Sequence, residues 1–465
     1  MLSRFFSFKL GSTGRQRRKL LLFALALILV VGSSIWRIIA TPSPSSALQP
    51  ALSPLPQDSH IQVFFNQSEA SVYTDPYRHI ERYGDDLEQI VVTAVDQAKT
   101  TVDVAVQALN LPHVAEALVK STHRGVKTRL ILENQYASLS SSDVDQNNAL
   151  QALRAGHVLL IDDTADGSKG SGLMHNKFLV IDSQWVLTGS ANLTLSGVHG
   201  DADEPASRGN ANALIKINSP TLASLFTAEF NQMWGDGPGA KPDSRFGLQK
   251  SNARAGKHQQ PSARRISLPS NEASSNITLQ FSPLSPKNPW NESVNGLISQ
   301  TLSQSKSSID LALFVFSEQR IANQLETQSQ AGTQLRVLVD PAFVYRSYSE
   351  VLDILGTTLL DQRCQLEADN RPWRSPVKTV GSPLLPPGDK LHHKFALIDG
   401  KTVIVGSHNW SDAANTKNDE ALLVIENAAV AAHFDREFER LYRNALIGDT
   451  PWLQRKAQES QQRCQ

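Results

Sequence analysis

Two stretches of the sequence decide the fold: Met174–Asn192, which reads MHNKFLVIDSQWVLTGSAN, and Leu391–Asn409, which reads LHHKFALIDGKTVIVGSHN. Both follow one template, His-x-Lys, four residues, Asp, six residues, Gly-Ser-x-Asn. The template positions are His175, Lys177, Asp182, Gly189, Ser190 and Asn192 in the first stretch and His392, Lys394, Asp399, Gly406, Ser407 and Asn409 in the second. Two matches with the same spacing indicate a duplicated motif rather than a coincidence.

The duplication extends well beyond the two motifs. Matching segments pair residues 60–66 with 276–282, 102–106 with 309–313, 129–132 with 336–339, and 213–234 with 421–442. The short β-type runs in these segments alternate with helical patterns, which is typical of an α/β fold with a mixed sheet flanked by helices. At 465 residues the chain is long enough for two such domains in tandem.

Each motif has the pattern of a strand, a turn and a second strand. Side chains two positions apart in a strand point the same way, so His175 and Lys177 are expected to project together at an exposed mouth. Gly-Ser at the end of the second strand allows a close backbone approach and brings a hydroxyl and the Asn amide to the same edge. Lysine supplies charge, serine and asparagine supply directed donors, and histidine can attack or protonate. The residues therefore predict a phosphate site.

Simpler interpretations apply to some of these positions. A single histidine on a strand is usually an ordinary structural residue, but two copies in matched context argue against that reading. No carboxylate or cysteine spacing converges with the histidines, so we expect no metal. Asp182 and Asp399 each end an apolar strand, which suits a turn-capping role, and Gly189 and Gly406 also belong to the structural part of the motif.

With these motifs the sequence resembles the phospholipase D superfamily, over roughly residues 60–445. The resemblance implies two domains related by a pseudo-twofold axis that share one active site within a single chain, and hence a monomer. It also implies a covalent phosphohistidine and no cofactor. By resemblance, His175 is the nucleophile and His392 the acid/base, and the phosphate is held by Lys177, Lys394, Asn192 and Asn409, with Ser190 and Ser407 secondary.

Members of that family commonly carry an acidic residue downstream of each motif, which orients the motif's histidine. Glu420 is at this place after the second motif, and the aligned place after the first is Asn212. An amide stabilises an imidazolium less than a carboxylate does. The longer loop before Asn212 offers Asp201, Asp203 and Glu204 as substitutes.

The substrate is a choice between classes. The formal net charge is zero, with 45 basic and 45 acidic residues, which argues against a main task of holding a long polyanion. The leading expectation is a phosphoric diester hydrolase of the phospholipase D type, which converts a glycerophospholipid into phosphatidate and free headgroup. The alternatives are an exported endonuclease acting on nucleic acid, a cardiolipin-synthase-like phosphatidyltransferase, and an inactive binding module.

The N-terminus predicts membrane proximity. A basic cluster precedes the uncharged run Leu20–Trp36, a pattern of a membrane anchor or an export signal. The catalytic domains would then be extracytoplasmic, in a periplasm or lumen, or secreted after cleavage.

The remaining chain divides by composition. The expected parts are an N-terminal segment 1–40, a Pro/Ser-rich tether 41–59, domain one 60–235, a flexible linker 236–275, domain two 276–446 and a polar tail 447–465. Cys364 and Cys464 have no metal-ligand spacing, and we interpret both as incidental, with a single bridge between them left open.

Overall fold

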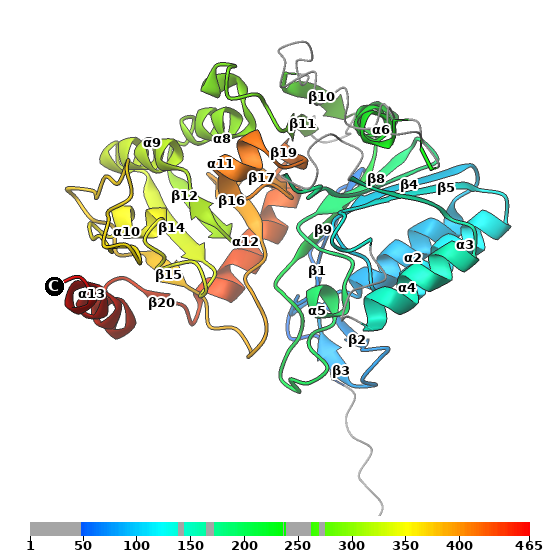
Figure 1. Ribbon diagram of the computed structural model, residues 1–465, viewed down its shortest axis with the longest axis horizontal. Coiled ribbons are helices and arrows are strands. Elements are labelled where there is room, and N and C mark those ends of the chain that lie inside the picture. The colour runs from blue at the N-terminus through cyan, green and yellow to red at the C-terminus, as the bar shows by residue number, and fades with distance from the viewer. Residues whose placement is uncertain (1–47, 138–143, 164–171, 236, 239–261, 269–274) are drawn as a thin grey trace, which may run out of the picture. The chain divides into compact units, whose positions relative to one another are not determined.

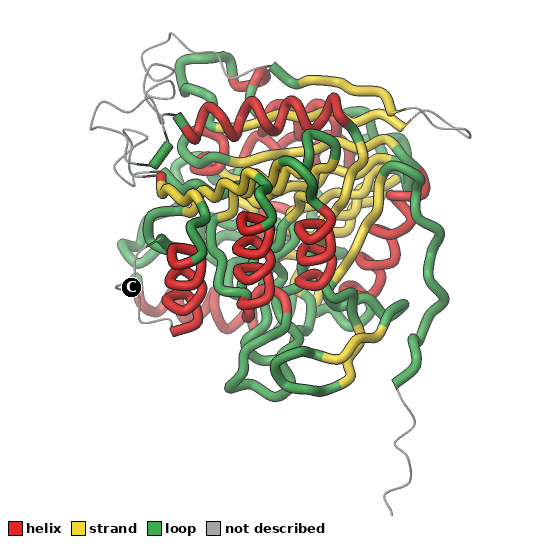
Figure 2. Tube along the Cα trace, turned by 90° about the vertical axis from the view of Figure 1, so that its right-hand side faces the viewer, coloured by secondary structure: helices red, strands yellow, loops and turns green. Residues whose placement is uncertain are grey.

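The computed structural model describes residues 48–137, 144–163, 172–235, 237–238, 262–268 and 275–465 (Figure 1). Pro50–Gln465 forms one compact unit, so both predicted domains lie within it. We call residues 60–235 the first half and residues 262–465 the second half. Each half is a mixed sheet flanked by helices, which confirms the predicted fold class (Figure 2).

The described elements of the first half alternate between strands and helices. They are β1 (Ile61–Phe65), β2 (Val72–Thr74), β3 (Glu81–Tyr83), α2 (Leu87–Gln97), β4 (Thr101–Val106), α3 (Pro112–His123), β5 (Lys127–Leu132), α4 (Val144–Ala155), β6 (Leu159–Asp162), β7 (Lys177–Ile181), β8 (Trp185–Gly189), α5 (Leu195–Val198), β9 (Ala213–Asn218) and α6 (Pro220–Trp234). The sheet order is β1-β9-β8-β7-β4-β5-β6, in which β4, β5 and β6 are parallel neighbours and the other pairs are antiparallel.

The second half repeats this order. Its described elements are β10 (Arg264–Leu268), β11 (Ser275–Ser282), η2 (Trp290–Glu292), α8 (Val294–Leu302), β12 (Ser308–Leu313), β13 (Phe316–Ser317), α9 (Gln319–Gln330), β14 (Gln334–Val339), α10 (Glu350–Ile354), β15 (Val380–Ser382), β16 (Lys394–Ile398), β17 (Thr402–Gly406), β18 (Trp410–Ser411), α11 (Asp412–Thr416), β19 (Glu420–Glu426), α12 (Ala428–Tyr442), β20 (Leu446–Ile447) and α13 (Pro451–Arg463). The sheet runs β10-β11-β19-β17-β16-β12-β14-β15-β20, so β10 and β20 are added at its two edges.

The halves share a hydrophobic core. Phe226 of α6 packs edge-on against Phe281 of β11 at 5.2 Å between ring centroids, and Phe434 of α12 packs edge-on against Phe65 of β1 at the same distance. Each contact joins a helix of one half to a strand of the other. Burying a phenylalanine contributes roughly 1.5–3 kcal/mol. This common core holds the two sheets in a fixed relation.

The expected flexible linker 236–275 and the expected polar tail 447–465 each contain a regular element that belongs to the second half. Within the expected linker 236–275, β10 pairs antiparallel with β11, because Ile266 and Leu268 alternate with exposed residues and bury their side chains. Most of the other residues of that linker lie outside the described residues. Within the expected tail 447–465, Thr450 caps α13, and Leu453 of this helix is buried.

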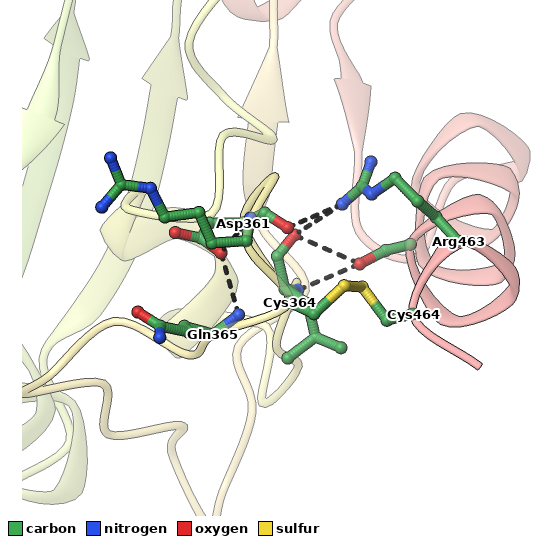
Figure 3. Close-up of a disulfide and its surroundings, with 8 residues drawn as sticks. Asp361, Cys364, Gln365, Arg463 and Cys464 are labelled. Carbon is green, nitrogen blue, oxygen red and sulfur yellow. Dashed lines mark hydrogen bonds between the residues drawn. A yellow bond between two sulfur atoms is a disulfide. The ribbon is translucent and has the colours of Figure 1, made fainter.

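The two cysteines form a disulfide, which corrects their interpretation as incidental residues (Figure 3). The bond joins Cys364, in the loop between α10 and β15, to Cys464 at the end of α13, across 100 residues. Next to it, Arg463 donates hydrogen bonds to the carbonyls of Leu360 and Asp361. The disulfide and these bonds fasten the C-terminal helix to the second half.

The expected tether 41–59 is also ordered where the structure describes it. Gln57 exchanges hydrogen bonds with the backbone of Val63, and Asp58 accepts one from Asn427 of the second half at 2.9 Å. Residues 50–59 therefore run along the folded unit, because the side chains of Gln57 and Asp58 find partners that composition does not reveal.

The predicted localisation requires correction. Over the described residues, the structure contains no helix that is both long and apolar enough to cross a membrane. The run Leu20–Trp36, on which that expectation rested, lies outside the described residues.

Candidate active site

Each histidine motif is fastened to the opposite half by backbone hydrogen bonds. The amide of His175 donates to the carbonyl of Asp419 at 3.0 Å, and the amide of Asp419 donates to Leu173 at 2.8 Å. In the matching pair, the amide of His392 donates to the carbonyl of Ala211 at 3.1 Å, and the amide of Ala211 donates to the carbonyl of Lys390 at 2.8 Å. The residues just before β7 and β16 thus meet those just before β19 and β9, which places both histidines at the seam between the halves.

The partners of the histidines are therefore crossed. His175 Nδ1 lies 2.8 Å from Glu420 Oε2, and His392 Nδ1 lies 2.9 Å from Asn212 Oδ1. This corrects the expectation that each motif supplies the partner of its own histidine. The reason is the backbone bridging, because Glu420 follows Asp419 and Asn212 follows Ala211. Asp201, Asp203 and Glu204, the suggested substitutes, are exposed, whereas both partners are buried.

The orientation of the Asn212 amide is fixed by two further bonds. Its Nδ2 donates to the carbonyl of Gly197 at 2.8 Å, and its Oδ1 accepts from the hydroxyl of Ser190 at 2.9 Å. The oxygen therefore faces His392 and can only accept, so Nδ1 of that imidazole carries the proton. Nε2 of His392 takes no part in this bond and is the nitrogen that can take up or release a second proton.

Glu420 is a fully buried carboxylate. Burial alone would raise the pKa of Glu420, but the imidazole of His175 and the ammonium of Lys177 hold that pKa below its usual value. Burial lowers the pKa of His175, and Glu420 offsets part of this effect. Burial, with the charges of Lys394 and Lys177, lowers the pKa of His392 well below the ordinary value. The carboxylate thus stabilises an imidazolium at His175 more than the amide does at His392.

The two lysines are buried side chains within the same site. Lys177 Nζ donates to the carbonyl of His175 at 2.8 Å, and Lys394 Nζ donates to that of His392 at 2.7 Å. Burial lowers the pKa of Lys177 to about 7, and burial together with the charge of Lys177 lowers the pKa of Lys394 well below its usual value. A bound anion would stabilise the protonated form of both lysines.

The histidines themselves are less accessible than the predicted exposed mouth implies. His175 is 5% exposed and His392 is 6% exposed, so only a small part of each imidazole faces solvent. Asn192 and Asn409 are partly buried, and among the described residues their side-chain oxygens have no hydrogen-bond partner. Burial to this degree limits the contact of both imidazoles with water.

The Gly-Ser pairs hold the ends of the strands together. Ser190 and Ser407 accept hydrogen bonds through their hydroxyls from the amides of Ala213 and Ala421, each at 3.0 Å. A Cβ at Gly189 would lie 2.2 Å from the carbonyl oxygen of Ala213, and one at Gly406 would lie 2.1 Å from that of Ala421. Only glycine allows β8 and β17 to come this close to the strands that carry the histidines' partners.

The aspartates of the motifs lie at the other end of the strands. Asp182 follows β7 at the end opposite Lys177, where its carboxylate accepts hydrogen bonds from the amides of Lys99, Thr100 and Thr101. Asp399 makes the same bonds to the amides of residues 306–308. Both carboxylates therefore fasten the loop that enters the neighbouring strand, and they are remote from the histidines.

Sequence reasoning missed an aromatic pair beside His392. The ring of Phe314 lies 4.9 Å from the imidazole of His392 and 5.0 Å from Nζ of Lys394, and Phe343 packs edge-on against Phe314 at 4.7 Å. Alignment of the two copies could have revealed this feature. Phe314 follows β12 at the place where Gln107 follows β4, so the two halves differ at this position.

Among the described residues, no group of three or more histidine, cysteine, aspartate or glutamate side chains could hold a metal ion.

Comparison with known proteins gives one family and several relatives. Residues 91–234 and 298–442 match the family model described as the cardiolipin synthase, PLD-like domain. The mitochondrial cardiolipin hydrolase of Mus musculus is 28% identical over 154 residues, which cover 33% of this chain and 60% of the relative. This chain thus spans less than two thirds of that relative.

Two solved structures are also similar. The phosphatidylserine synthase of Haemophilus influenzae Rd KW20 aligns with a TM-score of 0.55 at 13% identity, over 84% of this chain and 88% of that one. The phospholipase D family member Nuc from Salmonella typhimurium aligns over 38% of this chain and 95% of its own, with a TM-score of 0.28 and 21% identity. The synthase shows that the fold of both halves occurs together in another protein.

Proposed function

The chain belongs to the phospholipase D superfamily, and on this premise we propose that it hydrolyses a glycerophospholipid to phosphatidate and a free headgroup through a phosphohistidine. The observation that carries the proposal is the crossed pairing, in which Glu420 supports His175 and Asn212 supports His392. The two pairs bring two imidazoles with different partners to one buried site. Such a difference suits a nucleophile and an acid/base better than two equivalent groups.

In the first step, Nε2 of His175 attacks phosphorus. The P–N bond forms as the bond from phosphorus to the headgroup oxygen breaks, and His392, protonated on Nε2, gives its proton to that oxygen. The imidazole of His175 gains positive charge, which the Glu420 carboxylate stabilises through Nδ1–H. A strong acid is useful at His392, and its amide partner keeps that imidazolium acidic.

In the second step, His392 acts as a base, because it gave up its proton in the first step. Its Nε2 takes a proton from water, and the hydroxide attacks phosphorus while the P–N bond to His175 breaks. The products are phosphatidate and a His392 that is again protonated. Asn212 holds Nδ1–H throughout, so Nε2 faces the reaction in both steps.

The lysines are proposed to bind the non-bridging oxygens of the phosphate. Lys177 and Lys394 are tethered by the carbonyls of the two histidines, so their positive charges are placed beside the attacking and the protonating group. Desolvated cations of this kind stabilise the charge that develops on phosphorus oxygens. Asn192, Asn409, Ser190 and Ser407 are expected to complete the site.

A lipid is the substrate class favoured by the net charge of zero and by the relatives' names. The nuclease alternative depended on positive charge in the linker, most of which lies outside the described residues. Transfer to an acceptor alcohol instead of water would use the same two steps.

The test is a paired assay of the purified full-length protein in EDTA. Headgroup release from vesicles of phosphatidylcholine, phosphatidylglycerol and cardiolipin is compared with degradation of single- and double-stranded DNA. Headgroup release that is lost in His175→Ala supports the proposal. DNA cleavage without headgroup release, or a lipid activity that survives His175→Ala, contradicts it.

A further inference from the structure

The two sides of the active site differ in apolar character. On the side of His392, Phe314 and Phe343 form an edge-to-face pair, and both rings are partly exposed. Phe314 also contacts the imidazole of His392 at 4.9 Å between ring centroids. A phenyl pair at this position offers an apolar surface directly beside a histidine.

The first half has polar side chains at the corresponding places. The backbone amide of Gln107 donates a hydrogen bond to the carbonyl of Asn176, and the backbone amide of Phe314 donates the equivalent bond to the carbonyl of His393. Likewise, the backbone amide of Tyr136 donates to the carbonyl of Glu133, and that of Phe343 donates to the carbonyl of Asp340. The pseudo-symmetric partner of the phenyl pair is therefore a glutamine and a tyrosine.

This comparison separates two explanations of Phe314. If the fold needed an aromatic ring at the end of the strand, Gln107 would not occupy the equivalent place in the first half. The Phe314 ring therefore has a role that is needed only on the side of His392. Of the two sides, only the second lies next to the proposed acid, His392.

The geometry of the proposed reaction indicates which part of the substrate lies beside Phe314. In an in-line displacement at phosphorus, the attacking and leaving atoms stand on opposite sides. With His175 attacking, the leaving alcohol is next to His392 and so next to Phe314. We propose that Phe314 and Phe343 form the subsite for the leaving alcohol and that they favour an alcohol with an apolar body. This inference rests on the proposed function and on its assignment of the two histidines.

The contact with Lys394 supports the same conclusion. Its Nζ lies 5.0 Å from the centre of the Phe314 ring, so the ring shields the ammonium from water on that side. An apolar group placed on the phenyl pair would extend this shielding over the phosphate. A small polar alcohol would leave the rings in contact with water and gain less from them.

The test compares two phosphatidyl esters that share their acyl chains, one of ethanol and one of hexanol, in mixed micelles. Their leaving alcohols have similar acidity, so intrinsic reactivity is matched. For the wild-type protein we expect kcat/KM for the hexyl ester to exceed that for the ethyl ester by about tenfold. Phe314→Gln, which installs the residue of the first half, should reduce this ratio to about two or less.

The matched control is Gln107→Phe, which adds a ring on the opposite side and should leave the hexyl-to-ethyl ratio unchanged. The inference is overturned if Phe314→Gln lowers the rate for both esters by the same factor, because Phe314 would then only position His392. It is also overturned if the wild-type protein hydrolyses both esters equally well.

If neither ester is hydrolysed, the vesicle assay above decides the proposed function separately, and the subsite is tested by binding alone. Calorimetric titration of the full-length protein with hexyl phosphate and ethyl phosphate should show about tenfold tighter binding of the hexyl ester, lost in Phe314→Gln. Equal affinities of the wild-type protein for both would overturn the inference independently of any turnover.

Discussion

The two halves place the template side chains at equivalent points of two equivalent sheets, and they differ in the residue that is hydrogen-bonded to each histidine. His175 has the carboxylate of Glu420, supplied by the second half, and His392 has the amide of Asn212, supplied by the first. The phenyl pair beside His392 is a second difference. A duplicated fold has thus kept its framework and changed the residues that are hydrogen-bonded to its two histidines.

The exchange of partners explains how this divergence works. Each half carries its own histidine, and the opposite half supplies the side chain that is hydrogen-bonded to it. A substitution at Asn212 or Glu420 therefore changes the partner of the histidine in the other half. The asymmetry of the site consequently comes from Asn212 and Glu420 rather than from the six template positions of the motifs, which are the same in both. The predictions below test this division, from the largest expected effect to the smallest.

Removal of the Glu420 carboxylate should cause the largest loss of activity. In Glu420→Gln, the imidazolium formed at His175 loses its ionic partner while the hydrogen bond can be kept, so kcat should fall by about 10²–10⁴-fold. Steady-state kinetics with the preferred lipid measures the loss. A loss smaller than about threefold would mean that Glu420 does not support a charged His175. Circular dichroism of the variant controls for misfolding.

The disulfide belongs to the second half alone and should stabilise it alone. Replacing Cys364 and Cys464 together by serine releases a closed loop of 100 residues, which should cost about 2–4 kcal/mol. Native-state hydrogen exchange should show faster exchange in α13 and in β15, with β4 and β5 unchanged. Equal acceleration in both sheets would contradict a local role, and exchange of the wild-type protein under reducing conditions provides a second comparison.

Giving both histidines a carboxylate should move a pH profile. In Asn212→Asp, the new charge stabilises the imidazolium of His392 and raises its pKa, which burial and the two lysines hold low in the wild-type protein. Because the proposed acid must be protonated, the alkaline limb of kcat/KM should shift upward by about one pH unit. A shift confined to the acidic limb would instead assign the acid to His175. A thermal melt checks the effect of losing the Asn212 bond to Gly197.

Anion binding should be linked to proton uptake. Burial lowers the pKa of Lys177 to about 7, so at about pH 8 this amine is mostly neutral in the free site. A bound phosphate raises the pKa of the amine, and protons enter the protein on binding. Calorimetry with inorganic phosphate in two buffers of different ionisation enthalpy should detect uptake of about one proton or less. Lys177→Met should reduce the uptake, and an uptake unchanged in that variant would place the titrating group elsewhere.

The sequence was sufficient to predict the duplicated fold, because matched segments at constant spacing carry both the strand pattern and the motif. It was not sufficient to predict the crossing of Glu420 and Asn212. Their spacing from the motifs is the same whether they bond within a half or between halves. Only the backbone bridge between Asp419 and His175 decides between these arrangements, and local pattern does not contain it.

The other differences have a similar cause. The strand β10 holds two buried residues, Ile266 and Leu268, in a polar segment, so its hydrophobic pattern was too short to recognise. The helix α13 depends on partners distant in sequence, including Cys364. Such contacts become visible only when the sheet against which they pack is in place.

The most direct test of the central claim, that His175 attacks and His392 protonates, uses a phosphatidyl ester of p-nitrophenol. This leaving group departs without protonation, so His392→Ala should still release a burst of about one equivalent per site and then stop. Mass spectrometry under alkaline conditions should locate the phosphatidyl group on His175, and His175→Ala should give no burst. A burst in His175→Ala with the adduct on His392 would contradict the assignment and reverse the roles of the two halves.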